Sequence, residues 1–364
     1  MSDSNSPIRL IDAGTVSSIR SQTIYHALGY TQTEKTPDTI VFARPDTPYM
    51  CIGFFQDAHQ ELNVEFCKTN KLPIIRREQG GGAVYVDNNQ LFIQWIFQQK
   101  SLPLNVGHRF RLFVEPLIET HKQIGIDAYF HPINDVHVDG KKIVGTGAAG
   151  IGNAEIVTGN FLFDFDFETM VNALKVPNDG FKVDFSESLR QYLTTINKEL
   201  TNAPSDDEIK ALYVDCCERT LNRKLIAGKF TERELETMEA LDQKMLTDEW
   251  LYQFEKPMVD NRMVKVHAGV FIGNSSFFIN KEEVNMRLRM KDGMIDSISI
   301  DGEPLWLAEI KLEVEKALTG LKLEKEILKK GIRSLLNGKA SVVEKNLELL
   351  LSEIIEIKNR KPAS

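Results

Sequence analysis

The sequence predicts a two-domain α+β protein, and three observations carry this prediction. Residues 8–98 hold several short segments rich in β-branched and aromatic residues, separated by Pro, Gly, Asp and Asn as turns separate strands. After about residue 255 the pattern changes to strands followed by helices, which is typical of a small α+β domain. A chain of 364 residues is long enough to bury a core in each of two domains. We therefore expect a larger domain over residues 1–255 and a smaller one over residues 256–364.

The composition is that of an ordinary soluble globular protein, with 42% hydrophobic and 26% charged residues. A formal net charge of -8, with no long basic run, disfavours general binding to nucleic acid, which requires a basic face. The sequence shows no apolar run of about 18 residues, and its first residues lack the features of a signal peptide. We expect a cytoplasmic protein without a membrane span.

The larger domain is predicted to contain two amphipathic helices among its strands. The stretch "TVSSIRSQTIYHALGY" carries apolar residues at helical spacing, and a second helix is predicted from about residue 106 to residue 124. A second strand-rich tract runs from "DAYFHPINDVHV" to "EIVTGNFLFDFD", where we expect Asp164 and Asp166 on one face of a strand.

Two later helices have sequence signals in their first turns. Ser205 with Glu208, and Thr231 with Glu234, form capping boxes, in which the hydroxyl accepts from a free backbone N–H and the glutamate reaches back. The second helix is predicted to run through "LETMEALDQKMLTDEWL". The proline of "FEKPMVDN" then ends the larger domain.

The smaller domain is predicted to begin with strands. "MVKVHAGVFIG" is one strand region, and "EVNMRLRM" alternates apolar and polar residues strictly. With "KDG" and "MIDSISI" it forms a hairpin that has one buried face. Helical patterns around residues 305–318 and 324–336, and in "ASVVEKNLELLLSEIIEIKNR", close the chain.

The stretch "RREQGGGAVYVD", from Arg76 to Asp87, combines two arginines with three glycines. Glycines after a strand free the backbone amides to approach a ligand or to take a positive φ, and arginine suits carboxylate or phosphate. Because side chains alternate along a strand, we expect only one of the two guanidiniums to reach a given ligand. No GK[ST] follows, so this is not a nucleotide P-loop. By itself the pattern leaves a simple turn and an anion site equally open.

The stretch "NDVHVDGKKIVGTGAA" places two lysines at the exit of a hairpin turn, beside a segment rich in Gly, Thr and Ala. A lysine ammonium can stabilise negative charge that develops on a phosphate or a carbonyl oxygen. Two solvated lysines, with Asn134 and Asp135 as turn residues, are the alternative that the pattern alone leaves open.

In their order along the chain, these motifs resemble the lipoate–protein ligase family of the lipoate/biotin ligase and octanoyltransferase superfamily. The resemblance covers roughly residues 5–200, through "GFFQD", "NVEFC", "LPIIRREQGGGAVYVD", the lysine hairpin and "VTGNFLFDFD". "GMIDSISIDGE" resembles the accessory domain at the C-terminus of this family. The resemblance implies a mixed, largely antiparallel sheet flanked by helices in the larger domain.

The resemblance also implies a reaction in two steps. Lipoate or octanoate attacks the α-phosphate of Mg²⁺-ATP, and a lysine of a lipoyl-domain or H-protein-like carrier then displaces AMP from the acyl-adenylate. Lys142 matches the catalytic lysine of the family, and Asp135 would hold Mg²⁺. The other residues expected to bind ATP or the acyl substrate are Arg76, Arg77, Gly80, Gly81, Gly82, Ala83, Val84, Tyr85, Asn134, Asp135, Gly145, Thr146 and Gly159. Phe54, Phe55, Val84 and Tyr85 are candidates for an apolar slot around the acyl chain.

Several positions depart from the family pattern. Val86 and Thr158 stand where the family has histidines, and Gln79 stands where a small residue is common. These departures suggest a divergent branch whose acyl substrate or carrier differs from the usual one.

Two alternatives to an ATP-dependent ligase are a cysteine-dependent transferase and a non-catalytic binding protein. Transferases of the superfamily use a cysteine nucleophile. The four cysteines, which form no CxxC pair, all lie outside residues 68–215, so ligation by ATP is favoured over cysteine-based transfer. The other alternative is a non-catalytic binder of carrier proteins, in which the missing histidines reflect lost chemistry.

Overall fold

The chain forms two compact units. The structure, a computed structural model, describes residues 6–132, 134–176, 178–254, 262–267, 269–336 and 341–359. One unit comprises Met1–Lys175 and Arg190–Glu255, and the other comprises Val176–Leu189 and Lys256–Ser364. The expected boundary at 255/256 lies outside the described residues. Residues 176–189, which the sequence pattern assigned to the larger domain, group with the second unit.

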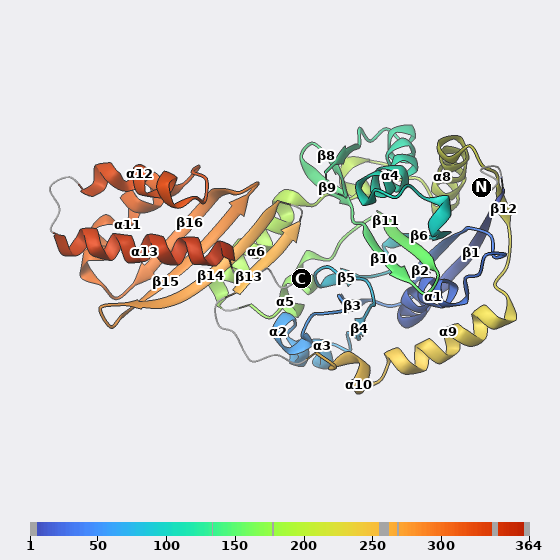
Figure 1. The fold of residues 1–364 in the computed structure, drawn as a ribbon, viewed down its shortest axis with the longest axis horizontal. Helices are drawn as coiled ribbons and strands as arrows, with labels where there is room; N and C mark the ends of the chain where they lie inside the picture. Colours follow the sequence, from blue (N-terminus) through green and yellow to red (C-terminus); the bar gives the residue numbers. More distant parts are fainter. Residues whose placement is uncertain are drawn as a thin grey trace. The chain divides into compact units, whose positions relative to one another are not determined.

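A six-stranded mixed sheet, in the order β10-β11-β6-β2-β1-β12, forms the centre of the first unit (Figure 1). The pairs from β10 to β2 are antiparallel, and those from β2 through β1 to β12 are parallel. This confirms the expected mixed, largely antiparallel sheet. Its strands are β1 (Ile8–Val16), β2 (Thr39–Pro45), β6 (Gln90–Gln98), β10 (Gly147–Ile151), β11 (Ala154–Leu162) and β12 (Leu225–Ala227).

Two small sheets of the first unit carry the sequence motifs. One has the order β4-β3-β5 and the other β7-β8-β9. Asp139 and Gly140, with φ of 47° and 77°, form the turn between β8 and β9, as "VDGKK" predicts. The strands are β3 (Tyr49–Ile52), β4 (Ile74–Arg76), β5 (Val84–Val86), β7 (Tyr129–His131), β8 (Asp135–Val138) and β9 (Lys141–Val144).

The four helices predicted for the first unit are confirmed. They are α1 (Ser18–Thr31), α4 (Val106–Gln123), α8 (Asp206–Leu221) and α9 (Glu232–Met245), and both capping boxes form. The sequence pattern missed other helices: α2 (Ala58–Glu61), α3 (Val64–Thr69), α6 (Asp179–Tyr192), α7 (Ile196–Glu199) and a 3-10 turn, η1 (Gln99–Ser101).

Two predicted elements end earlier than expected, each because a side chain caps a new helix. The helix expected to continue through Trp250 ends at Met245, and Thr247 caps the short helix α10 (Asp248–Leu251). The strand expected to present Asp164 and Asp166 ends at Leu162, and Asp166 caps α5 (Phe167–Ala173). An Asp or Thr side chain at such a position satisfies a backbone N–H that the helix leaves free.

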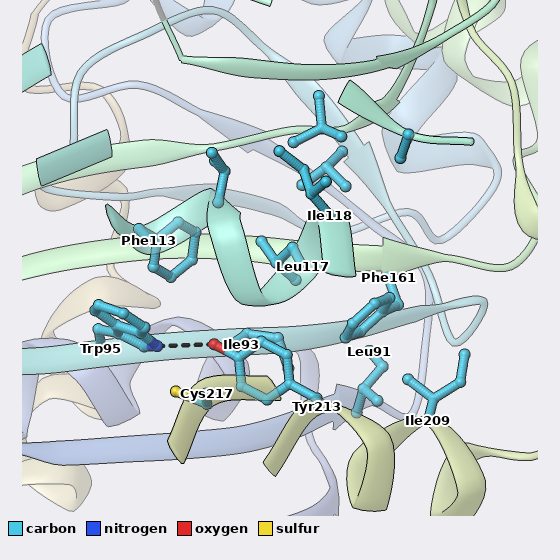
Figure 2. Close-up of a cluster of buried hydrophobic side chains, with 14 of the residues drawn as sticks. Leu91, Ile93, Trp95, Phe113, Leu117, Ile118, Phe161, Ile209, Tyr213 and Cys217 are labelled. Carbon is cyan, nitrogen blue, oxygen red and sulfur yellow. Dashed lines mark hydrogen bonds between the residues drawn. The ribbon is translucent and has the colours of Figure 1, made fainter. Parts of the chain in front are cut away.

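One core of the first unit lies between the sheet and helices α4 and α8 (Figure 2). Trp95 of β6 is fully buried, and its indole N–H donates to the hydroxyl of Tyr213 of α8 at 2.9 Å. Phe113 of α4 packs edge-to-face on Trp95, with ring centroids 5.1 Å apart. Alternate residues of β2 and β6 point to a second core, which α1 and α9 cover.

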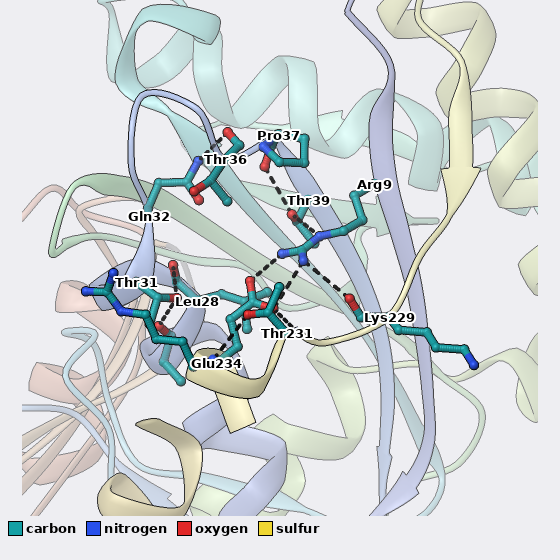
Figure 3. A network of polar contacts seen from close by, with 12 residues as sticks. Arg9, Leu28, Thr31, Gln32, Thr36, Pro37, Thr39, Lys229, Thr231 and Glu234 are labelled. Carbon is teal, nitrogen blue, oxygen red and sulfur yellow. Dashed lines mark hydrogen bonds and ion pairs between the residues drawn. The ribbon is translucent and has the colours of Figure 1, made fainter. Parts of the chain in front are cut away.

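An ion pair ties the segment that carries α9 to the sheet (Figure 3). Arg9 of β1 contacts the Glu234 carboxylate at 2.5 and 3.1 Å, and it also donates to Thr39. Glu234 is buried and accepts from the backbone N–H of Thr231, so one carboxylate serves both the capping box and the ion pair. Charged hydrogen bonds of this kind are stronger than neutral ones.

Among its described residues, the second unit contains a four-stranded antiparallel sheet and three C-terminal helices, as the sequence predicts, together with most of α6, which the sequence pattern missed (Figure 1). The residues Val284, Met286, Leu288 and Met290 are buried against the helices. The strands are β13 (Arg262–His267), β14 (Val270–Ile279), β15 (Glu282–Lys291) and β16 (Met294–Gly302), and the helices are α11 (Leu305–Leu318), α12 (Lys325–Leu336) and α13 (Ser341–Asn359). Of the helices in the described ranges, none has the length and apolar character to cross a membrane.

Acid is expected to destabilise the first unit through two buried histidines. Burial lowers the pKa of His26 and of His121 from 6.5 to about 4. The unfolded chain therefore binds more protons between these values. The stability that the neutral imidazoles contribute is fully present above pH 6.5 and is lost as the pH falls through 4, by about 3 kcal/mol for each histidine.

Urea unfolding at pH 7.5 and pH 4.5 measures this loss. The variant His121→Phe is expected to lose less stability than the wild type between the two pH values. His108, which is exposed, supplies the control His108→Gln, whose pH dependence should equal that of the wild type. If His121→Phe and His108→Gln lost equal stability between pH 7.5 and pH 4.5, burial of His121 would have no role in the acid sensitivity.

Candidate functional site

The structure places Lys142 of β9 beside Asp135 of β8. The Lys142 Nζ lies 2.8 Å from Asp135 Oδ1, and the side chains are 22% and 2% exposed, respectively. A buried carboxylate thus holds an ammonium whose outer side remains open. Two residues that the sequence singled out thus form one charged pair. Charge-assisted contacts of this kind fix a side chain in one geometry.

The backbone of Lys142 is fixed from a segment far along the sequence. The backbone N–H of Thr194 donates to the Lys142 carbonyl at 2.9 Å, and Leu193 forms a parallel bridge with Lys142. Sequence reasoning missed this support, because no local pattern links residue 193 to residue 142.

A hydrogen-bonded pair joins the turn before β8 to the segment after β9. Asn134 Nδ2 donates to Thr146 Oγ1 at 2.9 Å, and Thr146 Oγ1 donates to the Asn134 carbonyl at 2.5 Å. The neighbouring Gly145 lies against Lys142: a Cβ at position 145 would be 3.9 Å from the Lys142 Nζ. A side chain larger than alanine would therefore compete with the ammonium for space.

Two residues outside the predicted set complete this part of the site. Asn160 of β11 accepts from the backbone N–H of Gly145 at 3.2 Å and donates to Gln90 Oε1 at 3.0 Å. Gln90 in turn donates to the Tyr85 carbonyl at 3.1 Å. Sequence reasoning missed both residues, because the strands that carry them, QLFIQWIFQ and AEIVTGNFL, hold other polar residues and do not single out these two amides.

The glycine-rich loop is held from within by Arg77. Its Nη2 donates to the carbonyls of Gly80 and Gly82, both at 2.9 Å, and Gly81 has a φ of 97°. Gly53 lies beneath the loop, and a Cβ there would be only 2.1 Å from the Gly81 carbonyl oxygen. The motif "GFFQ" therefore requires glycine for close backbone approach.

A buried histidine supports the same loop from α1. His26 Nε2 lies 3.1 Å from the backbone N of Glu78, and His26 Nδ1 lies 2.7 Å from the Gln22 carbonyl. The carbonyl can only accept, so Nδ1 carries the proton and Nε2 accepts from Glu78. The lowered pKa of His26, which burial causes, keeps this arrangement at neutral pH.

The guanidiniums of the two arginines contact backbone carbonyls, and the ligand contacts expected for them stay a prediction. Arg76 is fully buried. Its guanidinium donates to backbone carbonyls of two segments, those of Gly53, Phe54, Gln56, Trp250 and Leu251. Arg77 is equally committed to the loop. The prediction that the two guanidiniums point apart agrees with these partners, but both point to protein carbonyls.

The four residues proposed for an apolar slot are divided between two places. Phe54 packs on Phe55 and Trp250, with ring centroids 4.9 and 5.9 Å apart, whereas Tyr85 packs edge-to-face on Phe165 at 5.8 Å. Val84 is 43% exposed, and the neighbouring Ala83 is half-buried. Phe54 and Phe55 thus pack together while Tyr85 packs on a different ring, and the apolar slot around an acyl chain stays a prediction.

The positions that depart from the family pattern have different surroundings. Val86 is buried in a core with Tyr49 and Ile75, so an apolar residue there has a packing role. The Thr158 hydroxyl donates to Gln79 Oε1 at 3.2 Å. Thus one missing histidine is replaced by core packing and the other by a polar contact.

Gly159 lies against Phe113 of the core, and its predicted place along the ligand pocket stays a prediction. A Cβ at position 159 would lie 2.8 Å from Phe113 Cε1 and 3.3 Å from the Gly145 carbonyl oxygen. Glycine here lets the Gly145 backbone pass close to β11, so its contribution to the site is indirect.

Asp135 is the predicted magnesium ligand, and this role stays a prediction: its carboxylate is buried and paired with the Lys142 ammonium. Within the described ranges, no group of three or more His, Cys, Asp or Glu side chains is arranged to hold a metal. Mg²⁺ that arrives with a nucleotide needs only one or two carboxylates, because phosphates and water supply the other ligands. A cation held by Asp135 would share it with Lys142.

Replacing Arg76 should reduce stability in the absence of any substrate. In Arg76→Lys a single ammonium cannot reach both backbone segments, and the buried carbonyls left without a donor should cost about 3 kcal/mol. Urea unfolding measures the loss, with the exposed Arg233 replaced by lysine as the control. If Arg76→Lys has unchanged stability and a raised KM for a substrate, the result would show that Arg76 binds substrate and does not stabilise the fold.

A methyl group at position 159 should strain the core. Gly159→Ala is expected to cost about 1–3 kcal/mol, because Phe113 must move. In the control Gly150→Ala, a Cβ meets no atom within 4 Å, so stability should stay close to that of the wild type. Equal midpoints in urea for the two variants would contradict the contact.

Comparison with known proteins places this geometry in a family. Residues 23–218 match the family described as the lipoyl protein ligase A/B catalytic domain. The lipoate-protein ligase LplJ of Bacillus subtilis (strain 168) is 25% identical over 283 residues, which cover 77% of this chain and 80% of LplJ. The octanoyltransferase LipM of Kyrpidia tusciae is 25% identical over 243 residues, 60% of this chain and 88% of LipM.

A solved structure agrees with these matches. The bi-partite lipoate protein ligase of Thermoplasma acidophilum superposes with a TM-score of 0.63 at 25% identity, over 70% of this chain and all of that chain (100%). The match to the family covers more than half of the chain and confirms the resemblance that the motifs suggested. The chain belongs to the lipoyl protein ligase A/B family, whose relatives named here are lipoate ligases and an octanoyltransferase.

Proposed function

We propose that the protein is an ATP-dependent lipoate–protein ligase, which joins lipoate or octanoate to a lysine of a lipoyl carrier protein. The observation that carries this proposal is the pairing of Lys142 with buried Asp135, 2.8 Å apart, next to Gly145. The Lys142 ammonium is open on one side, and the neighbouring Gly145 has no side chain. This arrangement leaves room for a substrate that carries adjacent carboxyl and phosphate groups.

In the first step, a carboxylate oxygen of the acid forms a bond to the α-phosphorus of ATP, and the bond to pyrophosphate breaks. The Lys142 ammonium contacts the carboxylate and the α-phosphate and offsets the charge that gathers between them. Asp135 holds the ammonium in place through the 2.8 Å ion pair. One preorganised donor of this kind typically lowers a barrier by about 3–4 kcal/mol.

The other residues of the predicted set position the substrates. The Asn134–Thr146 pair and the Asn160 bond to Gly145 hold the backbone beside Lys142 in one conformation. Backbone groups of the glycine-rich loop, Gly80–Gly82, and of the following Ala83–Tyr85 face the nucleotide and acyl group. Mg²⁺ at Asp135 would neutralise phosphate charge.

In the second step, the amine of a carrier lysine attacks the acyl carbon and AMP leaves. The Thermoplasma relative is described together with its E2 lipoyl domain. A lipoyl domain, or a carrier resembling the H-protein, is therefore the partner that we propose for this chain.

The cysteines favour a ligase over a thioester-forming transferase. All four are buried. Burial raises the pKa of the Cys51 thiol, raises that of Cys67 to about 11 and raises that of Cys217 to about 12. Nucleophilic catalysis requires an accessible thiolate, and all four of these thiols are buried. The likeness to LipM keeps transferase activity as the second candidate.

The experiment incubates the protein with lipoate, Mg²⁺-ATP and a lipoyl domain, and it measures AMP, pyrophosphate and the mass of the domain. Lys142→Ala should lower the rate of lipoate-dependent pyrophosphate release about 10²- to 10³-fold. Lys141→Ala is the matched control, because Lys141 is the exposed neighbour on the same strand.

Alkylation of cysteines and omission of ATP separate the candidates. A ligase keeps its activity after mild alkylation and needs ATP. Transfer of an octanoyl group between carriers without ATP, abolished by alkylation, would show that the transferase is correct. Equal pyrophosphate release by Lys142→Ala and the wild type would contradict the role of Lys142.

A further inference from the structure

We infer that Gln79 is a further catalytic residue, which donates a hydrogen bond to the acyl carbonyl oxygen while the carrier amine attacks, and that Thr158 positions it. This inference rests on the proposed function. It assigns a role to a side chain that stands where the family pattern has a small residue, and to the threonine that replaces a histidine.

The first observation is a buried amide that lacks a partner. Gln79 is only 3% exposed, and within the described part of the chain its Nε2 has no hydrogen-bond acceptor. A buried donor without an acceptor loses the hydrogen bond that water would provide, so native proteins rarely leave one unsatisfied. A bound substrate that supplies an acceptor oxygen accounts for this donor.

The second observation is that the amide is oriented. The Thr158 hydroxyl donates to Gln79 Oε1 at 3.2 Å, so the oxygen end faces β11 and the NH₂ end is presented away from it. Gly147 leaves the required space: a Cβ there would lie 3.1 Å from Gln79 Oε1 and 3.4 Å from Thr158 Oγ1.

The backbone of Gln79 is equally constrained. Its carbonyl accepts from the backbone N–H of Phe54 at 3.0 Å, and Arg77 holds the next residue, Gly80, through its carbonyl at 2.9 Å. A donor whose backbone and far end are both fixed is preorganised. Such a donor stabilises developing charge without reorganising during the reaction.

The position of Gln79 relative to Lys142 follows from the segment between them. Lys142 lies against Gly145 and Gln79 lies against Gly147. These glycines are two residues apart, so their Cα atoms are separated by at most about 7 Å. The short segment Gly145–Gly147 thus has the Lys142 side chain beside one glycine and the Gln79 amide, through its oxygen, beside the other.

The chemistry of transfer requires a donor there. As the amine nitrogen bonds to the acyl carbon, the carbonyl oxygen takes up negative charge. The electron pair on this oxygen re-forms the C=O bond when the C–O bond to AMP breaks, and the bonding pair leaves with the phosphate oxygen of AMP. The amine gives up its proton to solvent. In the acyl-adenylate, Lys142 contacts the phosphate, and the Gln79 N–H donates a hydrogen bond to the carbonyl oxygen.

Single-turnover transfer from preformed lipoyl-adenylate to a lipoyl domain tests the inference. Gln79→Glu keeps the shape and removes the donor, and Gln79→Met removes it without adding charge. Each is expected to lower the transfer rate constant about 10²-fold, whereas the KM for lipoate, measured separately in steady-state turnover, should change much less. Gln94→Met, at another buried glutamine, should transfer at the wild-type rate.

Thr158 supplies the test of positioning. Thr158→Val, which removes the hydroxyl and keeps the shape, should lower the transfer rate constant about tenfold, and Thr158→Ser should restore it. A wild-type rate constant in folded Gln79→Met would overturn the inference, as would equal losses in Thr158→Val and Thr158→Ser.

A binding measurement separates this inference from the proposed function. Titration with a non-reactive acyl-sulfamoyl-adenosine is expected to give at least tenfold weaker binding to Gln79→Met than to the wild type. If the wild type binds this analogue but never forms AMP, the proposed function fails and the Gln79 contact stands. Equal affinities of the two proteins would overturn the contact.

Discussion

The buried guanidinium of Arg76 is the interaction on which the arrangement around the glycine-rich loop depends. It donates to carbonyls of the segment that follows β3, including that of Phe54, and to carbonyls of α10. The Trp250 indole N–H donates back to the Arg76 carbonyl at 3.0 Å. Buried carbonyls that lose their donor are costly. The Arg76 side chain therefore fixes α10 to β4, the strand that leads into the loop. Arg77 binds carbonyls within the loop itself.

The candidate site consists mostly of backbone, with few reactive side chains. Glycines at positions 53, 145, 147 and 159 each allow a close approach that a side chain would hinder. Around this backbone lie a charged pair, Lys142 with Asp135, and an oriented amide, Gln79. This division of roles is physically reasonable for adenylate chemistry, because peptide N–H groups and one ammonium supply charge stabilisation without a nucleophile on the protein.

Much of the fold followed from local patterns. Strict alternation placed Val284, Met286, Leu288 and Met290 in a core, and two capping boxes gave the starts of α8 and α9. The pairing of Lys142 with Asp135 also agreed with the lysine hairpin that the sequence singled out. What the patterns missed were contacts between distant segments, such as Leu193 with Lys142, and the early ends of two elements where Thr247 and Asp166 cap new helices.

The sequence by itself determined the strands, the main helices, the family and the lysine hairpin, because these depend on periodicity, turn chemistry and the order of motifs. Only the tertiary structure decided how the charged and amide side chains are used. Arg76 and Arg77 carry the residue type of an anion site, yet they bind backbone carbonyls. Gln79 looked like a mere departure from a pattern, yet its buried amide is oriented by Thr158. The partners of a side chain are set by the segments that folding brings beside it, and these lie too far along the chain for local spacing to show.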